Sequence, residues 1–455
     1  MKIAVFGCGE IYKKYKELIL QHAEIVFIID NNPVLQGTYL DGIRICNPNC
    51  FDGDEIDYIA LMSDAAFEMR EQLVRCGYDK SRIKHYKELM GEWCVERLYY
   101  SASDEICKRR LLIVSNPLGY HGVGVVSLRA AICAKQIGFD VTIVSSHIDE
   151  RYIKEANDAG ISIVIQKFLE TASEKNLIWM SDYEIILFNS LPMVRCALKV
   201  NQKNRKIVWL HENEDTYDEV RYWSDEIQSV AHDDSIAIFA VSNRARNIFL
   251  SEYRVKRKIE ILFAPIEDWN NTRRINKNEF VIVLIGNICQ RKGQDIFLDA
   301  IRGIPKEKKS HMLFLLIGSK GIDEFSKAVY EKTLLENNVI LLGERSQQKI
   351  RSIYSYIDLV VVPSREETLS MVAVESMMMR KTCIVSDHCG IAEYISDGVN
   401  GFVFKSEDVD ELTKMIVKLF DNKVNLNTVG EQARKLYEEH FSIKKFEERL
   451  SYILA

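Results

Sequence analysis

The chain has 455 residues, of which 47% are hydrophobic and 28% charged, a composition typical of globular proteins and, at roughly 150 residues per domain, of about three domains. Lysine and arginine total 60 against 66 for aspartate and glutamate, so the net charge is −6 and no overall positive field draws the chain to nucleic acid. The longest apolar runs, such as Ile25–Ile29 and Leu359–Val362, are far shorter than the ~20 residues of a membrane helix, and the start of the chain has no signal-peptide pattern. We therefore expect a cytoplasmic protein with no nucleic-acid partner and no membrane span.

The first segment, residues 1–98, is predicted to be a small Rossmann-like domain. It begins with an apolar, β-branched run, a glycine turn and a helical pattern, which is how βα units of a parallel sheet start. The predicted elements are a strand, a helix and two further strands, in chain order: Lys2–Phe6, Tyr12–His22, Ile25–Ile29 and Tyr58–Leu61. The polar stretch Ser101–Arg110 is the predicted linker to the second segment.

The first turn of this segment matches the start of a dinucleotide-binding fingerprint. Gly7 and Gly9 follow the first strand, and Asp30 ends the next one, about twenty residues on, where the fingerprint has an acid. Tyr12 stands in place of the third glycine, so the helix cannot approach a pyrophosphate in the usual way. A nucleotide at Gly7, Gly9 and Asp30 is therefore one hypothesis for this segment, and a domain without a cofactor is the other.

Two further segments begin in the same way and are predicted to be doubly wound α/β domains, at residues 108–270 and 271–430, followed by terminal helices at 431–455. The strands predicted in the first of these are Leu111–Ser115, Val141–Val144, Ile161–Ile165, Glu184–Phe188, Lys206–Leu210 and Ile236–Val241. The strands predicted in the second are Phe280–Ile285, Met312–Ile317, Val339–Leu342, Leu359–Val362 and Thr382–Val385. Because open α/β sheets bind ligands at the carboxyl ends of their strands, the cleft between the two domains is the expected site.

A dense run of chemically informative residues, Pro363–Glu375, comes directly after the strand Leu359–Val362. Glu367 falls in the loop at the strand end, and Thr368 or its neighbours can cap a helix that carries Ser370, Met371 and Glu375. Free N–H groups at a helix start suit a phosphate, and a carboxylate is an acceptor suited to sugar or ribose hydroxyls. The alternative interpretation is a capped surface helix with a solvated acidic first turn.

Three motifs in this order resemble the donor half of glycosyltransferase family 4. They are Pro-Ser-x-x-Glu367 with Glu375 eight positions later, the segment Ser386–Val403 with its glycines, and Gly286–Asp295, which contains a Lys-Gly pair. The resemblance extends from about Leu111 to the end of the chain. It implies the GT-B fold, that is, two doubly wound Rossmann-like domains, here preceded by the small Rossmann-like domain. It also implies that the terminal helices, residues 431–455, cross back to the N-terminal half of that fold. It also implies a nucleotide-sugar donor between the domains and a retaining transfer to an acceptor hydroxyl without a metal.

The resemblance assigns roles to individual residues of the donor half. Glu367 resembles the glutamate that faces the donor sugar, Glu375 the one that binds the nucleotide ribose, and Lys292 the phosphate-binding lysine. A departing nucleoside diphosphate gathers negative charge, so Lys292 and the backbone N–H groups of Ser370 and Met371 would stabilise the transition state more than the ground state.

One position departs from the family pattern. The family often has an arginine just after the glycine that starts the Lys-Gly segment, and this chain has Asn287 there. The expected phosphate clamp is weaker as a result, and Arg291 and Arg365 are the candidates to replace the missing cation.

Two features of the second segment resemble parts of the same family. The loop Gly119–Gly124, with Gly122 and Gly124, is similar to a glycine-rich loop near the acceptor and the donor phosphates, although a tight βα turn explains it equally. His211, directly after a predicted strand, resembles an active-site histidine at a strand end. A structural histidine is the alternative, and both interpretations stay open.

The expected function is transfer of a sugar to a growing bacterial surface glycan, with a glycan or a lipid-linked glycan as acceptor. The first segment resembles Rossmann-like domains fused to bacterial sugar-modifying enzymes. Two other hypotheses remain: an NAD-type oxidoreductase or epimerase built on Gly7, Gly9 and Asp30, and an inactive sugar-nucleotide-binding scaffold, which Asn287 suggests.

No metal site is predicted. The 11 cysteines are scattered without a C-x-x-C pair, and Asp52-Gly53-Asp54 is interpreted as a solvated acidic turn. The basic stretches Lys199–Lys206 and Arg254–Lys258 are solvated faces or, alternatively, contacts to anionic lipid that would hold the protein at the inner face of the membrane.

Overall fold

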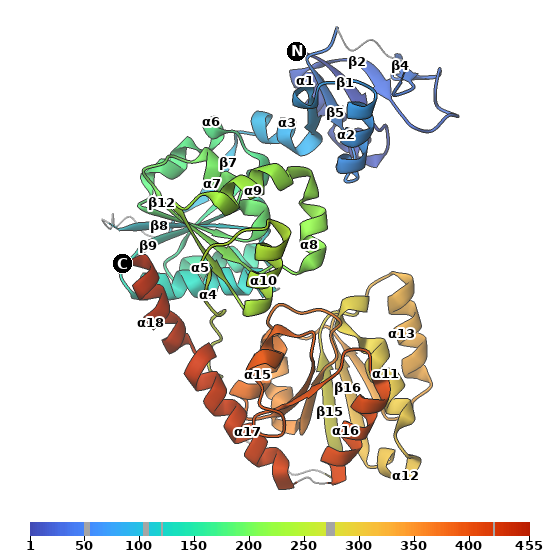
Figure 1. Cartoon of the computed structure of the whole chain (residues 1–455), viewed down its shortest axis with the longest axis vertical. Coiled ribbons are helices and arrows are strands. Elements are labelled where there is room, and N and C mark those ends of the chain that lie inside the picture. Colours follow the sequence, from blue (N-terminus) through green and yellow to red (C-terminus); the bar gives the residue numbers. More distant parts are fainter. Residues whose placement is uncertain (50–54, 103–108, 120–121, 270–277, 422–423) are drawn as a thin grey trace. The chain divides into compact units, whose positions relative to one another are not determined.

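A computed structural model describes residues 1–49, 55–102, 109–119, 122–269, 278–421 and 424–455 (Figure 1). Asp52 to Asp54, part of the predicted linker and the predicted boundary at 270–271 lie outside this range. The chain divides into two compact units. Unit 1 comprises Met1–Gly124, Phe139–Val208 and Asp215–Ala237, and unit 2 comprises Val125–Gly138, Trp209–Glu214 and Ile238–Ala455.

The first sheet has six strands in the order β3-β4-β2-β1-β5-β6, and all its pairs are parallel except β3 with β4. Its elements are β1 (Lys2–Phe6), α1 (Glu10–His22), β2 (Glu24–Ile29), β3 (Tyr39–Leu40), β4 (Ile43–Cys46), β5 (Tyr58–Leu61), α2 (Ala66–Arg75), β6 (Ile83–His85) and α3 (Tyr86–Trp93). The alternating apolar residues of β1 and β2 pack against α1 on one face, which gives this sheet its core. The predicted strands and helix of this segment are confirmed.

The second sheet has eight strands in the order β14-β13-β12-β11-β8-β9-β10-β7. Its elements are β7 (Arg97–Tyr100), β8 (Arg110–Ser115), α4 (Gly122–Gln136), β9 (Asp140–Ser145), α5 (Glu150–Asp158), β10 (Ser162–Gln166), β11 (Ile185–Asn189), α7 (Cys196–Lys199), β12 (Arg205–Leu210), α9 (Ser224–His232), β13 (Ile236–Ala240), α10 (Asn243–Glu252) and β14 (Glu260–Ile261). The sequence did not predict β7, because this short edge strand runs antiparallel to β10 and has no helix of its own.

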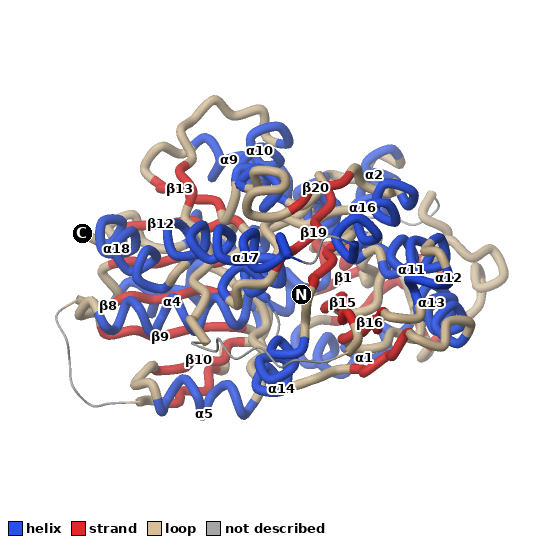
Figure 2. The backbone as a smooth tube through the Cα atoms, turned by 90° about the horizontal axis from the view of Figure 1, so that it is seen from below, coloured by secondary structure: helices blue, strands red, loops and turns tan. Residues whose placement is uncertain are grey.

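The third sheet has six strands in the order β17-β16-β15-β18-β19-β20, and every pair is parallel. Its elements are β15 (Phe280–Ile285), α11 (Gln294–Gly303), β16 (Met312–Ile317), α13 (Glu324–Leu334), β17 (Val339–Gly343), α14 (Gln347–Ile353), β18 (Leu359–Val362), α15 (Met371–Met378), β19 (Thr382–Ser386), β20 (Phe402–Phe404), α16 (Val409–Asp421), α17 (Val424–Leu436) and α18 (Ile443–Leu454). Its central strands are continuous apolar runs because helices cover both faces, as Figure 2 shows for β15 and β16.

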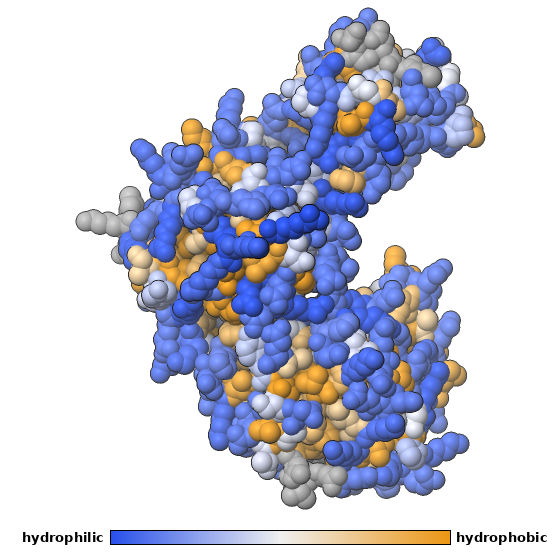
Figure 3. Space-filling view, in the orientation of Figure 1, coloured by the Kyte–Doolittle hydropathy of each residue, from blue (hydrophilic) through white to orange (hydrophobic). Residues whose placement is uncertain are grey.

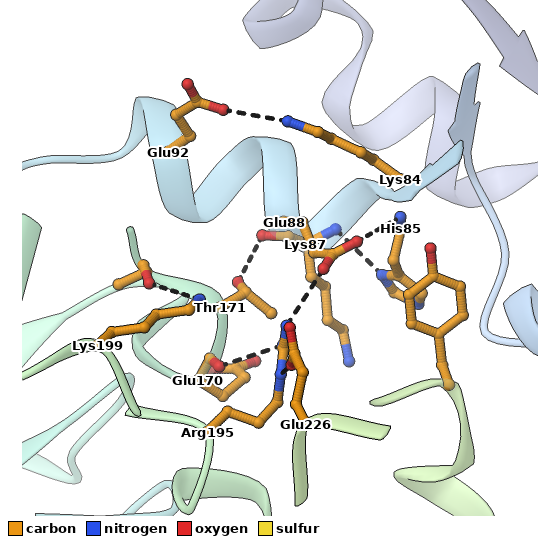
Figure 4. A network of polar contacts seen from close by, with 12 residues as sticks. Lys84, His85, Lys87, Glu88, Glu92, Glu170, Thr171, Arg195, Lys199 and Glu226 are labelled. Atoms are coloured by element: carbon orange, nitrogen blue, oxygen red, sulfur yellow. Dashed lines mark hydrogen bonds and ion pairs between the residues drawn. The ribbon is translucent and has the colours of Figure 1, made fainter. Parts of the chain in front are cut away.

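A buried polar network within unit 1 joins the end of the first sheet to the second (Figure 4). Arg195, directly before α7, is 2% exposed; its Nη2 lies 3.2 Å from Glu88 Oε1 in α3, and its Nε pairs with Glu226 in α9. The hydroxyl of Thr171 donates to the carbonyl of Lys87 at 2.5 Å. A Cβ at Gly91 would overlap the backbone of Thr171, so α3 packs directly on that turn.

The C-terminal helices pack within unit 2. The hydroxyl of Tyr437 donates to the carbonyl of Ile266 at 2.8 Å, and the ring of Phe446 in α18 stacks on Trp209 with centroids 5.6 Å apart. Arg449 forms an ion pair with Glu260 at the end of the second sheet. Helix α18 therefore contacts β12 and β14.

The surface in view in Figure 3 is mostly hydrophilic, with apolar side chains in scattered groups. Among the helices that the structure describes, none is long and apolar enough to span a membrane.

Candidate functional site

The loop between β18 and α15 holds Glu367 at the carboxyl edge of the third sheet. Its backbone pairs with the loop after β19: the Glu367 N–H donates to the carbonyl of His388 at 3.2 Å, and the Gly390 N–H donates to the Glu367 carbonyl at 2.8 Å. A Cβ at Gly390 would overlap the carbonyl oxygen of Thr368, so only glycine allows this close approach. Two loops at the ends of neighbouring strands thus fix the position of Glu367.

Two cations from the loop after β15 converge on the Glu367 carboxylate. Lys292 Nζ and Arg291 Nη1 both contact Glu367 Oε2, the latter at 3.1 Å, and Arg291 also donates to the Glu366 carbonyl at 3.1 Å. Gly293, with φ of +68°, turns the chain back so closely that a Cβ would overlap the Pro363 carbonyl. Burial acts to raise the pKa of Glu367, but the charges of Lys292 and Arg291 outweigh it and hold this pKa below its usual value.

This arrangement can bind an anion beside a fixed carboxylate. The Glu367 side chain is only 15% exposed, whereas the Arg291 side chain is 34% exposed and retains donors for a further acceptor. An entering phosphate would share the two cations with Glu367, whose carboxylate keeps acceptor capacity for hydroxyl groups.

Arg365 and Asn287 have partners within the protein. The Arg365 guanidinium contacts both oxygens of Asp295 at 2.9 and 2.7 Å and also Glu407 at 2.8 Å, so it joins three segments of the loop region. The side-chain oxygen of Asn287 accepts the Ser319 N–H at 3.4 Å. Of the two predicted substitutes for the missing arginine, Arg291 is therefore the one beside Glu367.

The predicted helix is present as α15, which begins at Met371 and carries Glu375, and its cap is Ser370. Ser370 is 3% exposed, and its hydroxyl accepts the Ala373 N–H at 3.3 Å, which makes it the N-cap. Its φ of +80° lies in the left-handed region that favours glycine. Farther along the helix, burial raises the pKa of Glu375 to about 7, with Arg129 opposing the shift. Burial therefore favours the neutral form of the Glu375 carboxyl group.

His211, in the segment Trp209–Glu214 of unit 2, is bound to the loop that carries Glu367. The carbonyl of His211 accepts the Thr368 hydroxyl at 3.0 Å, and the Glu214 N–H donates to Glu366 Oε1 at 2.6 Å. Burial lowers the pKa of His211 to about 3, so its imidazole is neutral at physiological pH. The sequence missed Glu214 and Glu366, although Glu366 directly precedes the predicted Glu367.

A cavity of about 570 Å³ lies beside this loop within unit 2. One wall is a face of α10, whose N-cap is Ser242. The residues that line the cavity are Glu214, Arg244, Asn247, Ile248, Ser251, Glu252, Asp387, Cys389, Gly390 and Glu393. The α10 residues were not predicted as site residues, although their spacing of three and four places them on one helical face.

Gly122 and Gly124 belong to unit 1, at the start of α4. A Cβ at Gly124 would overlap the carbonyl of Gly119, whereas a Cβ at Gly122 would meet nothing within 4 Å. Gly124 is thus required by the turn itself, which is the predicted structural alternative. Residues 120 and 121 of this loop lie outside the described range.

Asp30, the acid of the dinucleotide-binding fingerprint, forms hydrogen bonds with the glycine turn of the same fingerprint. Asp30 Oδ2 accepts the Cys8 N–H at 3.3 Å and the Cys8 thiol at 3.1 Å, while Oδ1 accepts the Asn32 N–H at 2.8 Å. Gly7 supplies the positive φ, +96°, that the turn needs, and Gly9 is the N-cap of α1. Asp30 therefore bonds to the turn at the position where a dinucleotide would need a ribose acceptor.

Among the described residues, no group of three or more His, Cys, Asp or Glu is placed to hold a metal ion.

Comparison with known proteins identifies two parts of the chain. Residues 265–436 match the family described as "Glycosyl transferases group 1", and residues 1–84 match one described as "C2185-like, N-terminal". An uncharacterized glycosyltransferase of Methanocaldococcus jannaschii is 28% identical over 218 residues, 46% of this chain and 58% of that protein. The lipopolysaccharide 1,2-N-acetylglucosaminetransferase of Salmonella typhimurium is 26% identical over 199 residues, 41% of this chain and 52% of that protein. The chain thus spans about half the length of these curated relatives.

Solved structures share the fold. HepE of Anabaena, crystallised with UDP and glucose, superposes with a TM-score of 0.64 at 16% identity, over 76% of this chain and 98% of HepE. The predicted α/β class, with the doubly wound Rossmann-like sheets of a GT-B glycosyltransferase, is confirmed. Residues 265–436 form a glycosyltransferase group 1 domain.

Proposed function

We propose that this chain, which carries a glycosyltransferase group 1 domain, is a retaining glycosyltransferase that transfers a sugar from a nucleotide-sugar donor to an acceptor hydroxyl. The observation that carries the proposal is the Glu367 carboxylate, 15% exposed and paired with both Lys292 and Arg291, in the loop that leads into α15. The acceptor is a bacterial surface glycan or its lipid-linked precursor, and the reaction requires no metal and no resident cofactor.

In this proposal the cations and the helix start hold the donor diphosphate. The acceptor oxygen bonds to the anomeric carbon, and the bond from that carbon to the phosphate oxygen breaks with its electron pair left on the phosphate. The hydroxyl proton passes to the same leaving oxygen. Lys292, Arg291 and the N–H groups of Ser370 and Met371 stabilise the charge that develops there.

The remaining predicted residues orient the donor. Glu367 accepts hydroxyl groups of the donor sugar, and Glu375 accepts those of the ribose. The imidazole of His211 is neutral in this proposal, because burial lowers its pKa to about 3. Arg365 holds the loop through Asp295 and Glu407.

The test is a panel of nucleotide sugars incubated with the purified chain, with release of the nucleoside diphosphate followed by mass spectrometry. HepE was crystallised with UDP, so UDP-sugars are the first probes and GDP-sugars the second. We expect slow hydrolysis of one donor. Lys292→Ala and Glu367→Gln should each reduce it by a factor of about 100 or more, because each removes part of the transition-state contact. Lys332→Ala, which removes an ion pair with Asp299 on α13 and α11, is the matched control.

The same experiment separates the rival hypotheses. Binding of a nucleotide sugar without turnover, even when a mixture of glycan acceptors is added, would favour an inactive scaffold. If no nucleotide sugar binds but NAD does, an oxidoreductase or epimerase is favoured and the transferase proposal is wrong. The bonds from Asp30 to Cys8 and Asn32 weigh against that second result.

Membrane attachment is a separate part of the proposal. The stretch Arg254–Lys258 would attract anionic lipid at the inner face of the membrane. The predicted alternative, Lys199–Lys206, does not fit this role, because Lys199 and Lys206 donate to the carbonyls of Ala172 and Ala197 and Lys206 is buried. We expect the protein to sediment with phosphatidylglycerol vesicles but not with phosphatidylcholine vesicles. High salt should abolish this difference, because it screens the attraction between the basic side chains and the anionic lipid.

A further inference from the structure

The cavity beside Glu367, here named the acidic cavity, has an unbalanced charge. Four carboxylates line it, those of Glu214, Glu252, Asp387 and Glu393, and Arg244 is the one cation among the described residues that line it. Arg244 Nη2 lies 3.5 Å from Glu214 Oε1, so the charge of one of the four carboxylates is balanced by a cation. The remaining lining is therefore negative.

The walls of the acidic cavity are held in place by hydrogen bonds from outside it. Asn243 donates to Glu393 Oε2 at 2.8 Å, and the Ser406 N–H donates to Asp387 Oδ1 at 2.7 Å. On α10, Arg244, Ile248 and Ser251 recur at spacings of four and three, so they point to the same side of one helix. One wall is thus helix α10 and the other is the turn after β19 with the short 3-10 helix Gly390–Tyr394. The cavity volume lies in the range of small-molecule sites, about 300–1,000 Å³.

The acidic cavity is adjacent to the reacting centre but is separate from its cations. Cys389 and Gly390 form part of its lining and pair with the backbone of Glu367. Neither Arg291 nor Lys292 is among the described lining residues. A nucleoside diphosphate would thus be attracted to the two cations and repelled by the acidic cavity, since like charges at close range are unfavourable.

We propose that the acidic cavity binds the acceptor and selects one whose reacting sugar is neutral or carries an amino group, and excludes uronic acids and phosphorylated sugars. Carboxylates accept hydrogen bonds from hydroxyl and ammonium groups, and Asn247 and Ser251 add donors and acceptors suited to a polyol. A carboxylate or phosphate on the acceptor would meet at least three uncompensated acids. This inference rests on the proposed transferase activity and narrows its acceptor class.

The experiment uses the full chain and the donor that the nucleotide-sugar panel identifies. Transfer is measured to matched aryl glycosides of a hexose, an aminohexose, a hexuronic acid and a phosphorylated hexose. We expect kcat/KM for the neutral and amino acceptors to exceed that for the two anionic acceptors by about tenfold or more, with a smaller ratio at high ionic strength. An equal rate, a preference for the anionic acceptors, or transfer to none of them while the donor is hydrolysed, overturns the assignment.

A charge reversal at the rim tests the cause. Glu252 is exposed at the C-terminal end of α10, so Glu252→Lys should fold normally and should lower the ratio of neutral to anionic acceptor kcat/KM by roughly tenfold. Glu331→Lys makes the same charge change on the exposed side of α13 and should leave the ratio as in the wild type. An unchanged ratio in Glu252→Lys would show that the lining does not select the acceptor. Failure of donor hydrolysis and donor binding would instead count against the transferase activity itself.

Discussion

Glu375 is a carboxyl group whose surroundings favour its neutral form. Burial raises its pKa from 4.5 to about 7. Between these two pH values the folded chain keeps a proton that the unfolded chain has lost, so the contribution of this group to stability is complete below pH 4.5 and disappears as the pH rises through about 7. Glu375→Gln removes this pH dependence. We compare the free energy of unfolding of the variant with that of the wild type at each pH. This difference should be more favourable to the variant at pH 8 than at pH 5 by on the order of 1–3 kcal/mol.

Urea denaturation of both proteins at the two pH values measures this difference. Glu438→Gln serves as the control, because the Glu438 side chain is 52% exposed and pairs with Arg434 at the end of α17. A variant-to-wild-type difference that is the same at pH 5 and pH 8 would show that Glu375 titrates normally in the folded chain.

Single residues also mark the limits of prediction from sequence. Glu367 could be placed at a strand end because the run Leu359–Val362 and the helix after it are local patterns. The partners of Arg365 could not be found in this way, since Asp295 and Glu407 lie 70 and 42 residues from it along the chain. Charge alone made Arg365 and Arg291 equal candidates, and only the fold distinguishes them.

At the scale of elements, the start of α15 combines a favourable cap with an unfavourable backbone. The Ser370 hydroxyl caps the helix, but its φ of +80° costs a residue with a Cβ about 1 kcal/mol relative to glycine. Ser370→Ala keeps this strain and loses the cap, whereas Ser370→Gly loses the cap and relieves the strain. We therefore expect Ser370→Gly to be more stable than Ser370→Ala by about 1 kcal/mol.

Thermal denaturation of the two variants side by side tests this prediction. Ser346, which caps α14 from an extended conformation at φ of −62°, provides the comparison. There the advantage of Ser346→Gly over Ser346→Ala should be smaller than at position 370, since only the N-cap preference for glycine over alanine remains and no left-handed strain is relieved. Equal stability of the two Ser370 variants would mean that the loop relaxes around the alanine.

The strands were predicted unevenly for a physical reason. Central parallel strands such as β15 and β18 are continuous apolar runs, because helices cover both faces, and they were found. β7 was missed because a four-residue edge strand with three exposed residues has no apolar periodicity to detect. It pairs with β10 through backbone hydrogen bonds, which the side chains do not encode.

At the scale of the whole molecule, the network around Arg195 shows how the first sheet is attached within unit 1. Arg195 lies 107 residues from Glu88 and 31 from Glu226, so no local pattern could reveal the contact. Its side chain is 2% exposed, and those of Glu88 and Glu226 are 24% and 40% exposed. The guanidinium is thus almost fully desolvated and depends on both carboxylates, which themselves retain some contact with water.

Arg195→Met should therefore loosen α3. Removing one partner of a buried ion pair costs about 3–5 kcal/mol, and the partial exposure of the two carboxylates reduces the expected loss to about 2–3 kcal/mol. Lys80→Met is the matched control, because Lys80 and Asp225 form a 2.8 Å pair with side chains 53% and 83% exposed, which should contribute less than about 1 kcal/mol. Arg195→Lys keeps the charge but not the planar donor set. Its loss in free energy of unfolding should therefore lie between those of Arg195→Met and Lys80→Met.

Hydrogen exchange followed by mass spectrometry locates the effect. If the network fastens the first sheet through α3, peptides covering Tyr86–Trp93 and the turn Leu169–Thr171 should exchange faster in Arg195→Met, while those of β15 and β16 in unit 2 should be unchanged. The Thr171–Lys87 bond and the close contact at Gly91 join the same two segments, so they should loosen together with the ion pairs. Protection of α3 that is equal in Arg195→Met and Lys80→Met would mean that apolar packing of Leu89 and Met90, both buried, holds the helix without the ion pairs.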